Sequence, residues 1–245
     1  MDNEFVQITT ADGTADCHVY RPAGAGPWPG VIFFMDAPGI RSDLQAMAQR
    51  LAGHGYYVLL PNLYYRMADT PPLDLSRIIQ DQAERERMRA MARSLTSEKI
   101  VRDTHAYLQH LTRAPQVKRA RIGCVGYCMG GRFALVAAGR YPDLIGAAAS
   151  FHGTQLATDQ TDSPHLLANA IKAQLYVGVA EIDPSLMPGE TERLETAFKS
   201  AGVRYQVEIY PKVHHGFTVP GLPVYDRDAS ERHWDRLLQL FREAI

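Results

Sequence analysis

The sequence lacks the features that mark membrane, nucleic-acid-binding and secreted proteins. Its 245 residues carry 26 basic and 27 acidic side chains, so the net charge of −1 argues against a basic surface for nucleic acid or anionic lipid. No apolar run approaches the roughly 20 residues of a membrane span, and residues 1–4 lack the basic and apolar regions of a signal peptide. We therefore expect a cytoplasmic protein without nucleic-acid or membrane partners.

Cysteine is also scarce, and its placement argues against disulfides and a metal site. The three cysteines, Cys17, Cys124 and Cys128, form no framework of pairs and no C-x-x-C of the kind that binds zinc. A reduced compartment with a free thiol is the simplest account, and Cys17 and Cys124 are expected to pack in the core. The chain has neither a G-x-G-x-x-G nor a P-loop motif, and we expect no metal and no organic cofactor.

Repeats, low-complexity stretches and long linkers are absent as well. This favours one domain over residues 1–245, as a monomer or a small homo-oligomer. Hydrophobic residues make up 46% of the chain, which is enough for one large core. A hairpin is expected within residues 5–20, and Ser42 and Gln45 are spaced as a capping box at the start of the first helix.

Beyond the hairpin, predicted strands alternate with predicted helices. The expected strands are 31–35, 56–60, 122–125, 146–151, 174–179 and 205–210. The expected helices are 42–54, two within 73–112 with a break near 94–97, 132–140, 190–201 and 229–242. This alternation predicts an α/β fold, a mostly parallel twisted sheet of about seven or eight strands with helices on both faces.

The most informative stretch is the hexapeptide Gly-Tyr-Cys-Met-Gly-Gly at 126–131, which follows an apolar run at 121–125. A G-x-nucleophile-x-G pattern between a strand and a helix forms a sharp turn, and glycine is needed because larger side chains would collide there. The helix that follows points its amino end at Cys128, and its dipole and free N–H groups favour a thiolate. The pattern predicts a nucleophile elbow with sulfur in place of oxygen.

A nucleophilic thiol needs a base, and the base needs a carboxylate to orient it. In a sheet of this kind they follow the nucleophile in the order acid, then histidine. Asp183 and His215 each lie just beyond the carboxyl end of a predicted strand, so both are expected to meet the thiol above one edge of the sheet. Glu181 competes with Asp183, and His214 competes with His215. His152 lies at another strand end and could also reach the site.

With these residues the chain resembles the dienelactone hydrolase family of small α/β-hydrolases over nearly its whole length. The resemblance rests on the elbow, on Asp183 after the next-to-last strand, on His-Gly-Phe at 215–217 and on Pro-Asn-Leu-Tyr at 61–64. It implies an α/β-hydrolase fold with Cys128 as nucleophile, Asp183 as orienting acid and His215 as base.

The resemblance also implies supporting roles around the thiol. The N–H groups of Met129 and Ala37 would form the oxyanion hole. Asp36 matches a carboxylate that lies close to the thiol in the family, where it would hold the cysteine protonated until substrate displaces it. The alternative is that Asp36 hydrogen-bonds within its own tight turn.

Substrate-binding residues follow from the resemblance with one departure. Arg66 matches the first of two family arginines that hold a substrate carboxylate, although a solvated loop arginine would look the same in sequence. The second is expected four positions after His215, where this chain has Val219, so recognition of a carboxylate is in question. Arg41 and Arg227 are candidate substitutes. The aromatic residues expected to line the pocket are Tyr64, Tyr65, Tyr127 and Phe217, and the alternative is that they pack in the core.

Sulfur as the nucleophile restricts the substrate. The tetrahedral intermediate expels either sulfur or oxygen, and a thiol with a pKa of about 8.5 leaves more readily than an ordinary alcohol. Enol lactones, aryl esters and thioesters carry stabilised leaving groups, which can compete with the cysteine sulfur for departure from the intermediate. We therefore predict hydrolysis of small activated carboxylic esters or enol lactones through an acyl-enzyme on Cys128, with His215 activating water.

Two other functions fit parts of the pattern. A class I glutamine amidotransferase also has G-x-C-x-G at an elbow, but its base and acid are expected as His-x-Glu, and Phe217 stands in place of that Glu. A hydrolase-fold protein that has lost activity and serves as a binding or thiol-redox module would also keep a cysteine in a cleft. The intact set of nucleophile, acid and base argues against lost activity.

Overall fold

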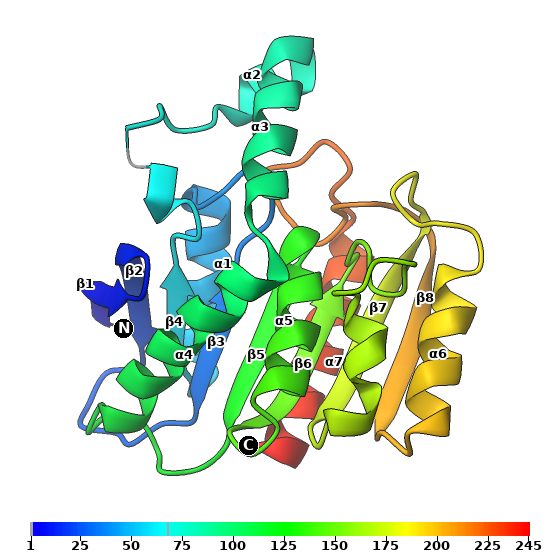
Figure 1. Cartoon of the computed structure of the whole chain (residues 1–245). Helices are drawn as coiled ribbons and strands as arrows, with labels where there is room; N and C mark the ends of the chain where they lie inside the picture. The colour runs from blue at the N-terminus through cyan, green and yellow to red at the C-terminus, as the bar shows by residue number, and fades with distance from the viewer. Residues whose placement is uncertain (1, 68) are drawn as a thin grey trace.

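The computed structural model describes residues 2–67 and 69–245, and these residues build one eight-stranded sheet (Figure 1). The strands are β1 (Asp2–Thr10), β2 (Gly13–Arg21), β3 (Gly30–Phe34), β4 (Tyr57–Pro61), β5 (Ile122–Tyr127), β6 (Ile145–Phe151), β7 (Gln174–Ile182) and β8 (Tyr205–His214). Their order in the sheet is β1-β2-β4-β3-β5-β6-β7-β8. Only β1–β2 and β2–β4 pair antiparallel, and the later pairs are parallel. The predicted α/β-hydrolase fold is confirmed.

Helices cover both faces of the sheet. They are α1 (Ser42–Gly53), α4 (Ser97–Arg113), α5 (Met129–Arg140), α6 (Glu190–Ser200) and α7 (Arg227–Ala244). In Figure 1, α4, α5 and α6 lie in front of the sheet, and α1 and α7 lie behind it, where Arg50 of α1 bonds to Glu231 of α7 at 2.7 Å. Every residue of β3, β4, β5 and β6 is buried, as expected for parallel strands covered on both faces.

The charged segment at 73–112 forms three helices rather than the predicted two. They are α2 (Leu75–Gln80), α3 (Gln82–Ser94) and α4. Asp81 ends α2 and its carboxylate accepts a hydrogen bond from the N–H of Ala83, so one residue stops one helix and caps the next. The predicted break near 94–97 is confirmed. Figure 1 shows α2 and α3 projecting beyond the edge of the sheet at which α5 begins.

The capping box predicted at Ser42 is wrong. The residue at the N-cap of α1 is Arg41, and the cap has no side-chain hydrogen bond. Gln45 instead extends toward β2, where its amide nitrogen lies 3.4 Å from Nε2 of His18. A tertiary contact has therefore replaced the local one that the spacing suggested.

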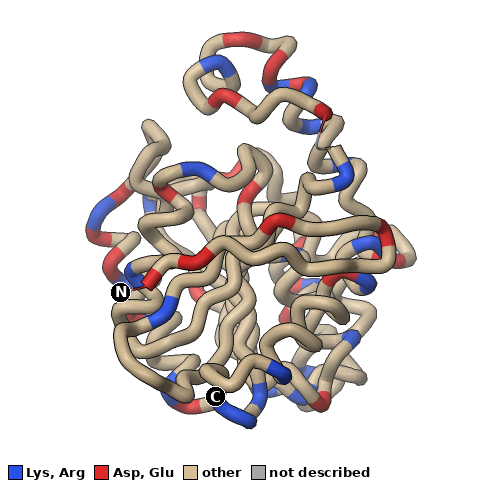
Figure 2. Tube along the Cα trace, turned by 90° about the vertical axis from the view of Figure 1, so that its left-hand side faces the viewer, with Lys and Arg blue, Asp and Glu red and all other residues tan. Residues whose placement is uncertain are grey.

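Charges of both signs are mixed over the chain trace, including the projecting α2 and α3 (Figure 2). Among the helices of the described residues, none is both long enough and apolar enough to cross a membrane.

Candidate active site

Cys128 occupies the sharp turn between β5 and α5. Its backbone has φ 55° and ψ −123°, a strained conformation for a residue with a side chain. A Cβ added at Gly126 would lie 1.9 Å from the carbonyl oxygen of Gly130, and one added at Gly130 would lie 2.4 Å from that of Phe34. Backbone therefore fills the space on both sides of Cys128, which is the reason that the sequence needs glycine there.

Asp183 and His215 meet at the carboxyl ends of β7 and β8. Nδ1 of His215 donates to Oδ2 of Asp183 at 2.7 Å. The other carboxylate oxygen of Asp183 accepts bonds from the N–H of Ser185 at 2.9 Å and from its hydroxyl at 2.6 Å. The Asp183 side chain is 2% exposed and that of His215 is 25% exposed. One carboxylate thus closes its own turn and orients the histidine.

The competing residues lie elsewhere. Glu181 accepts a hydrogen bond from the N–H of Lys212 at 2.6 Å, which joins the ends of β7 and β8. His214 is exposed at the end of β8. The structure therefore brings Asp183 and His215 together, and it engages Glu181 in a separate contact.

The surroundings of His215 raise its pKa. Burial lowers the pKa of His215, but the negative charge of Cys128 and hydrogen bonds to Asp183 and Cys128 outweigh it and raise the pKa to about 10. Because Nδ1 is bonded to Asp183, Nε2 is the ring nitrogen left for the contact with Cys128. The imidazole is thus held in the orientation needed to exchange a proton at the reacting centre.

His152, at the end of β6, is a member of the site that sequence reasoning left without a role. Its Nδ1 accepts a hydrogen bond from the N–H of Cys128 at 3.2 Å, and its Nε2 lies 2.8 Å from the hydroxyl of Thr218. Its ring meets that of His215 edge to face, with centroids 4.9 Å apart. Burial and the nearby charges of His215 and His233 lower the pKa of His152 far below its usual range, so the ring is neutral. Its position at a strand end was the only sequence signal.

The predicted oxyanion residues are held by Tyr64. Its hydroxyl donates to the carbonyl oxygen of Ala37 at 2.8 Å and lies 3.8 Å from the sulfur of Met129. Burial raises the pKa of Tyr64, so the hydroxyl remains protonated and able to donate. Met129 is the first residue of α5, where a backbone N–H has no partner within the helix. The structure therefore brings both predicted oxyanion residues to one tyrosine.

Asp36 forms a two-pronged ion pair with Arg41. Its carboxylate oxygens accept from Nη1 and Nη2 of Arg41 at 2.7 and 2.8 Å. Burial raises the pKa of Asp36, and the bonds from Arg41 oppose that effect. The guanidinium of Arg41 is thereby occupied by a buried carboxylate. The predicted control of the thiol by Asp36 stays a prediction, and it has to operate through a carboxylate already paired.

Arg66 has other partners. Its guanidinium bonds to the buried carboxylate of Asp103 at 2.6 and 2.9 Å and to Asp12 at 2.7 and 3.0 Å. These carboxylates come from α4 and from the turn between β1 and β2. Two ion pairs thus occupy the arginine predicted to hold a substrate carboxylate. Arg227 is exposed at the start of α7.

Of the predicted aromatic lining, Tyr64 contacts the oxyanion residues, whereas Tyr127 and Phe217 lie in the core. Tyr127 and Phe217 have no exposed surface. The Tyr127 hydroxyl lies 3.2 Å from Nε2 of buried His233, and the ring of Phe217 packs edge to face on His152, with centroids 5.6 Å apart. Both residues support the site from the core, and Val219 is fully buried as well.

The three cysteines differ in access. Cys17 and Cys124 are buried free thiols, whereas Cys128 is partly exposed. Burial raises the pKa of Cys17 to about 12 and also raises that of Cys124. Within residues 2–67 and 69–245, no group of three or more His, Cys, Asp or Glu side chains is arranged to hold a metal ion.

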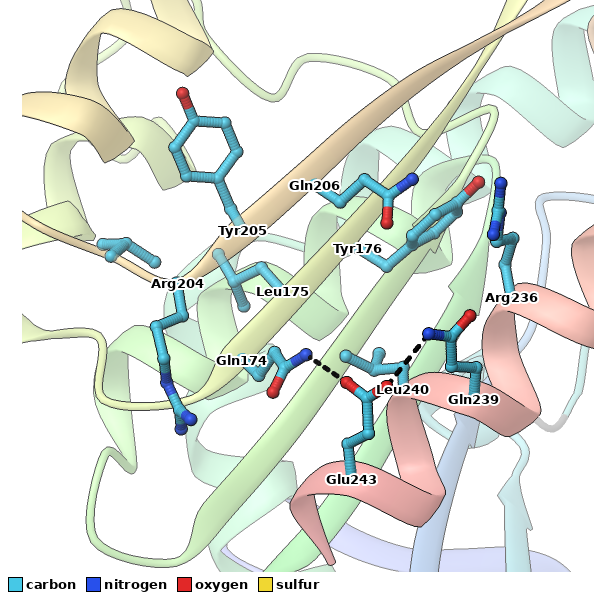
Figure 3. A pocket seen from close by; sticks show the side chains of 11 residues that line it. Gln174, Leu175, Tyr176, Arg204, Tyr205, Gln206, Arg236, Gln239, Leu240 and Glu243 are labelled. Atoms are coloured by element: carbon cyan, nitrogen blue, oxygen red, sulfur yellow. Dashed lines mark hydrogen bonds between the residues drawn. The ribbon is translucent and has the colours of Figure 1, made fainter.

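A pocket of about 420 Å³ lies at the opposite edge of the sheet (Figure 3). It is formed by the amino ends of β7 and β8 and by the last turns of α7, and Glu243 in its lining accepts hydrogen bonds from Gln174 and Gln239 at 2.9 Å. Asp183 and His215 follow the carboxyl ends of the same strands. This pocket is therefore separate from the candidate active site.

Comparison with known proteins gives one consistent result. The model of the "Dienelactone hydrolase family" matches residues 15–245. A relative from Synechocystis sp., named "Putative carboxymethylenebutenolidase", is 26% identical over 238 residues, which cover 93% of this chain and 91% of the relative.

Solved structures agree on the fold. A "Putative Dienelactone Hydrolase" from Klebsiella pneumoniae superposes with a TM-score of 0.83 at 20% identity, covering 98% of both chains. A dienelactone hydrolase-like promiscuous phosphotriesterase from metagenomic libraries superposes with a TM-score of 0.75 at 23% identity, covering 99% of this chain and 98% of that one.

Proposed function

The chain belongs to the dienelactone hydrolase family, and on that premise we propose that it hydrolyses activated carboxylic esters or enol lactones through an acyl-enzyme on Cys128. Family membership makes it a hydrolase of ester or lactone bonds in a small molecule. The observation that carries the finer proposal is the hydrogen bond of 2.7 Å from His215 to Asp183, beside the strained Cys128 turn.

The first half-reaction forms a thioester. The thiolate of Cys128 attacks the carbonyl carbon, and the carbonyl electrons move onto oxygen, where the N–H groups of Met129 and Ala37 stabilise the charge. The intermediate collapses by breaking the bond to the leaving oxygen, which takes its proton from Nε2 of His215. Sulfur competes with that oxygen as leaving group, so only an enol, phenol or similarly stabilised alcohol departs efficiently.

Thioester formation prepares His215 for the second half-reaction. The charge of Cys128 and its hydrogen bond are two of the effects that raise the pKa of His215 in the free enzyme. Acylation removes both, while burial continues to lower the pKa, so His215 becomes a base that can accept a proton from water. The hydroxide attacks the thioester, the carbon–sulfur bond breaks, and the thiolate and imidazolium are restored.

Steady-state kinetics of three proteins test this proposal. We expect wild type to hydrolyse p-nitrophenyl acetate and enol lactones, and Cys128→Ala and His215→Ala to lose at least about a thousandfold in kcat. Full turnover by Cys128→Ala would contradict the covalent mechanism. If wild type hydrolysed none of these substrates, a binding or thiol-redox role would replace it.

The compartment, the oligomeric state and the absence of a cofactor are part of the same proposal. Three free thiols are consistent with a reducing compartment, and we place the protein in the cytoplasm as a monomer or a small homo-oligomer. No metal or organic cofactor takes part in the steps above, since the residues named supply every proton transfer.

A further inference from the structure

A cavity of about 460 Å³ lies beside the loop that carries the predicted oxyanion residue Ala37. Strands β1 and β2, the loop after β3 and the segment from Thr70 to Leu73 that leads into α2 form part of its wall. Single residues of α1 and α3 and the segment that follows β4 complete it. Its described lining residues include neither Cys128 nor His215. The cavity is thus distinct from the catalytic groups, and its volume lies in the range of small-molecule sites.

The cavity adjoins the reacting centre through two residues. The first is Pro38, which lines it and directly follows Ala37 in the chain. The second is Tyr64, which also lines the cavity while its hydroxyl bonds to Ala37 and approaches Met129. A substrate carbonyl held at the N–H of Ala37 therefore has the cavity one residue away, within reach of a substituent.

The described lining suits an uncharged group. It contains neither lysine nor arginine, and Asp16 is its only carboxylate. The polar groups at its wall include His18 and Gln45, which contact each other at 3.4 Å, and burial lowers the pKa of His18, which favours the neutral ring. Apolar side chains supply much of the remaining surface, among them Ile40 and Leu73.

Three arginines close to the lining do not change this balance. Arg87 donates to the carbonyl oxygens of Pro71 and Pro72 at 2.7 and 3.1 Å, but Glu84 accepts two further hydrogen bonds from its guanidinium. Arg66 follows the lining residue Tyr65 in the chain, but ion pairs with Asp12 and Asp103 occupy its guanidinium. Arg41 follows Ile40, and Asp36 holds its guanidinium by two hydrogen bonds. A carboxylate entering the cavity would lose water, meet Asp16 and find no free cation among the described lining residues.

We propose that this cavity binds the uncharged, apolar or aromatic part of the substrate, so that the enzyme selects neutral activated esters and lactones over carboxylate-bearing ones. The proposal rests on the proposed function for the position of the ester group. Val219 stands where the second arginine of a carboxylate site is expected, so the sequence left open whether the substrate carries a carboxylate. The proposal answers that question with a neutral substrate.

A matched pair of esters tests the selectivity. We expect kcat/KM for p-nitrophenyl phenylacetate to exceed that for its 4-carboxyphenylacetate analogue by at least about tenfold in wild type. Gln45→Arg places a cation at the wall and is expected to reduce that ratio by about tenfold. The control is Gln49→Arg, the same change one turn later on an exposed part of α1, which should keep the wild-type ratio.

Binding without turnover separates this proposal from the proposed function. In Cys128→Ala we expect phenylacetamide, but not its 4-carboxy analogue, to bind in ligand-observed NMR, and a further Leu73→Trp change to abolish that binding by filling the cavity. This result would support binding of an uncharged group in the cavity even if wild type hydrolysed neither ester.

The proposal is overturned if phenylacetamide binding is absent or survives Leu73→Trp. It is also overturned if the esters are hydrolysed with Cys128-dependent rates and Gln45→Arg keeps the wild-type ratio.

Discussion

The backbone N–H of Cys128 donates a hydrogen bond to Nδ1 of His152 at 3.2 Å, and the same N–H lies 3.1 Å from the carbonyl oxygen of Phe151. Both Cys128 and His152 have positive φ, at 55° and 39°. Because Nδ1 accepts this bond, the neutral ring carries its proton on Nε2 and donates to Thr218. One buried imidazole thus joins the Cys128 turn to the hydroxyl of Thr218.

His152→Phe tests this relationship. The ring is kept and the acceptor is lost, so we expect kcat to fall about tenfold with a smaller change in KM, at a cost of about 1 kcal/mol in the free energy of unfolding. His152→Gln, whose amide oxygen can accept the same bond, should recover part of kcat. Wild-type kinetics in His152→Phe, measured beside its unfolding curve, would refute a positioning role.

Asp183→Asn removes the charge that orients His215. The amide can present its N–H group to Nδ1 and so favour the wrong tautomer, and we expect kcat to fall by about three to four orders of magnitude. Ser185→Ala leaves the carboxylate in place but removes the 2.6 Å bond to it, so its loss should be far smaller. Equal losses in the two variants would show that the turn matters rather than the charge.

The titration of His215 should depend on the sulfur. Its pKa is raised to about 10 in the free enzyme, and the charge of Cys128 is the largest of the effects that raise it. Cys128→Ser should therefore lower this pKa, because a hydroxyl stays neutral. His215 in the variant would then lose its proton at a lower pH than in wild type. NMR titration of isotope-labelled histidine measures both values. The same or a higher pKa in Cys128→Ser would contradict the ion pair.

Alkylation should be confined to one thiol. Cys17 and Cys124 are buried, and burial raises the pKa of both, so iodoacetamide is expected to add one carbamidomethyl group per folded chain, on Cys128. Peptide mapping by mass spectrometry locates the label. Early labelling of Cys17 or Cys124 under native conditions would contradict this order of access.

The sequence predicted those parts of the site that depend on chain order. The elbow glycines, Asp183 and His215 each stand at a strand end, and parallel strands bring their carboxyl ends to one edge, so spacing alone places them together. Family resemblance added Ala37 and Met129, and the structure brings both to the Tyr64 hydroxyl.

The parts that escaped prediction depend on contacts between distant segments. The direction of Arg66 is set by Asp12 and Asp103, which lie 54 and 37 positions away in the chain. The contact of His152 with Cys128 spans 24 positions and follows no motif. Similarly, Gln45 contacts His18 instead of completing a local cap, because tertiary packing outweighs one hydrogen bond at a helix end.

Acyl transfer through the sulfur of Cys128 should leave a transient adduct on that residue. Mass spectrometry of wild-type protein mixed with p-nitrophenyl acetate and quenched in acid during the first turnover would detect it. We predict one acetyl group per chain, located by peptide mapping on Cys128 and lost as the reaction proceeds. Release of p-nitrophenol without an adduct on Cys128, or with the acetyl group on another residue, would contradict the account.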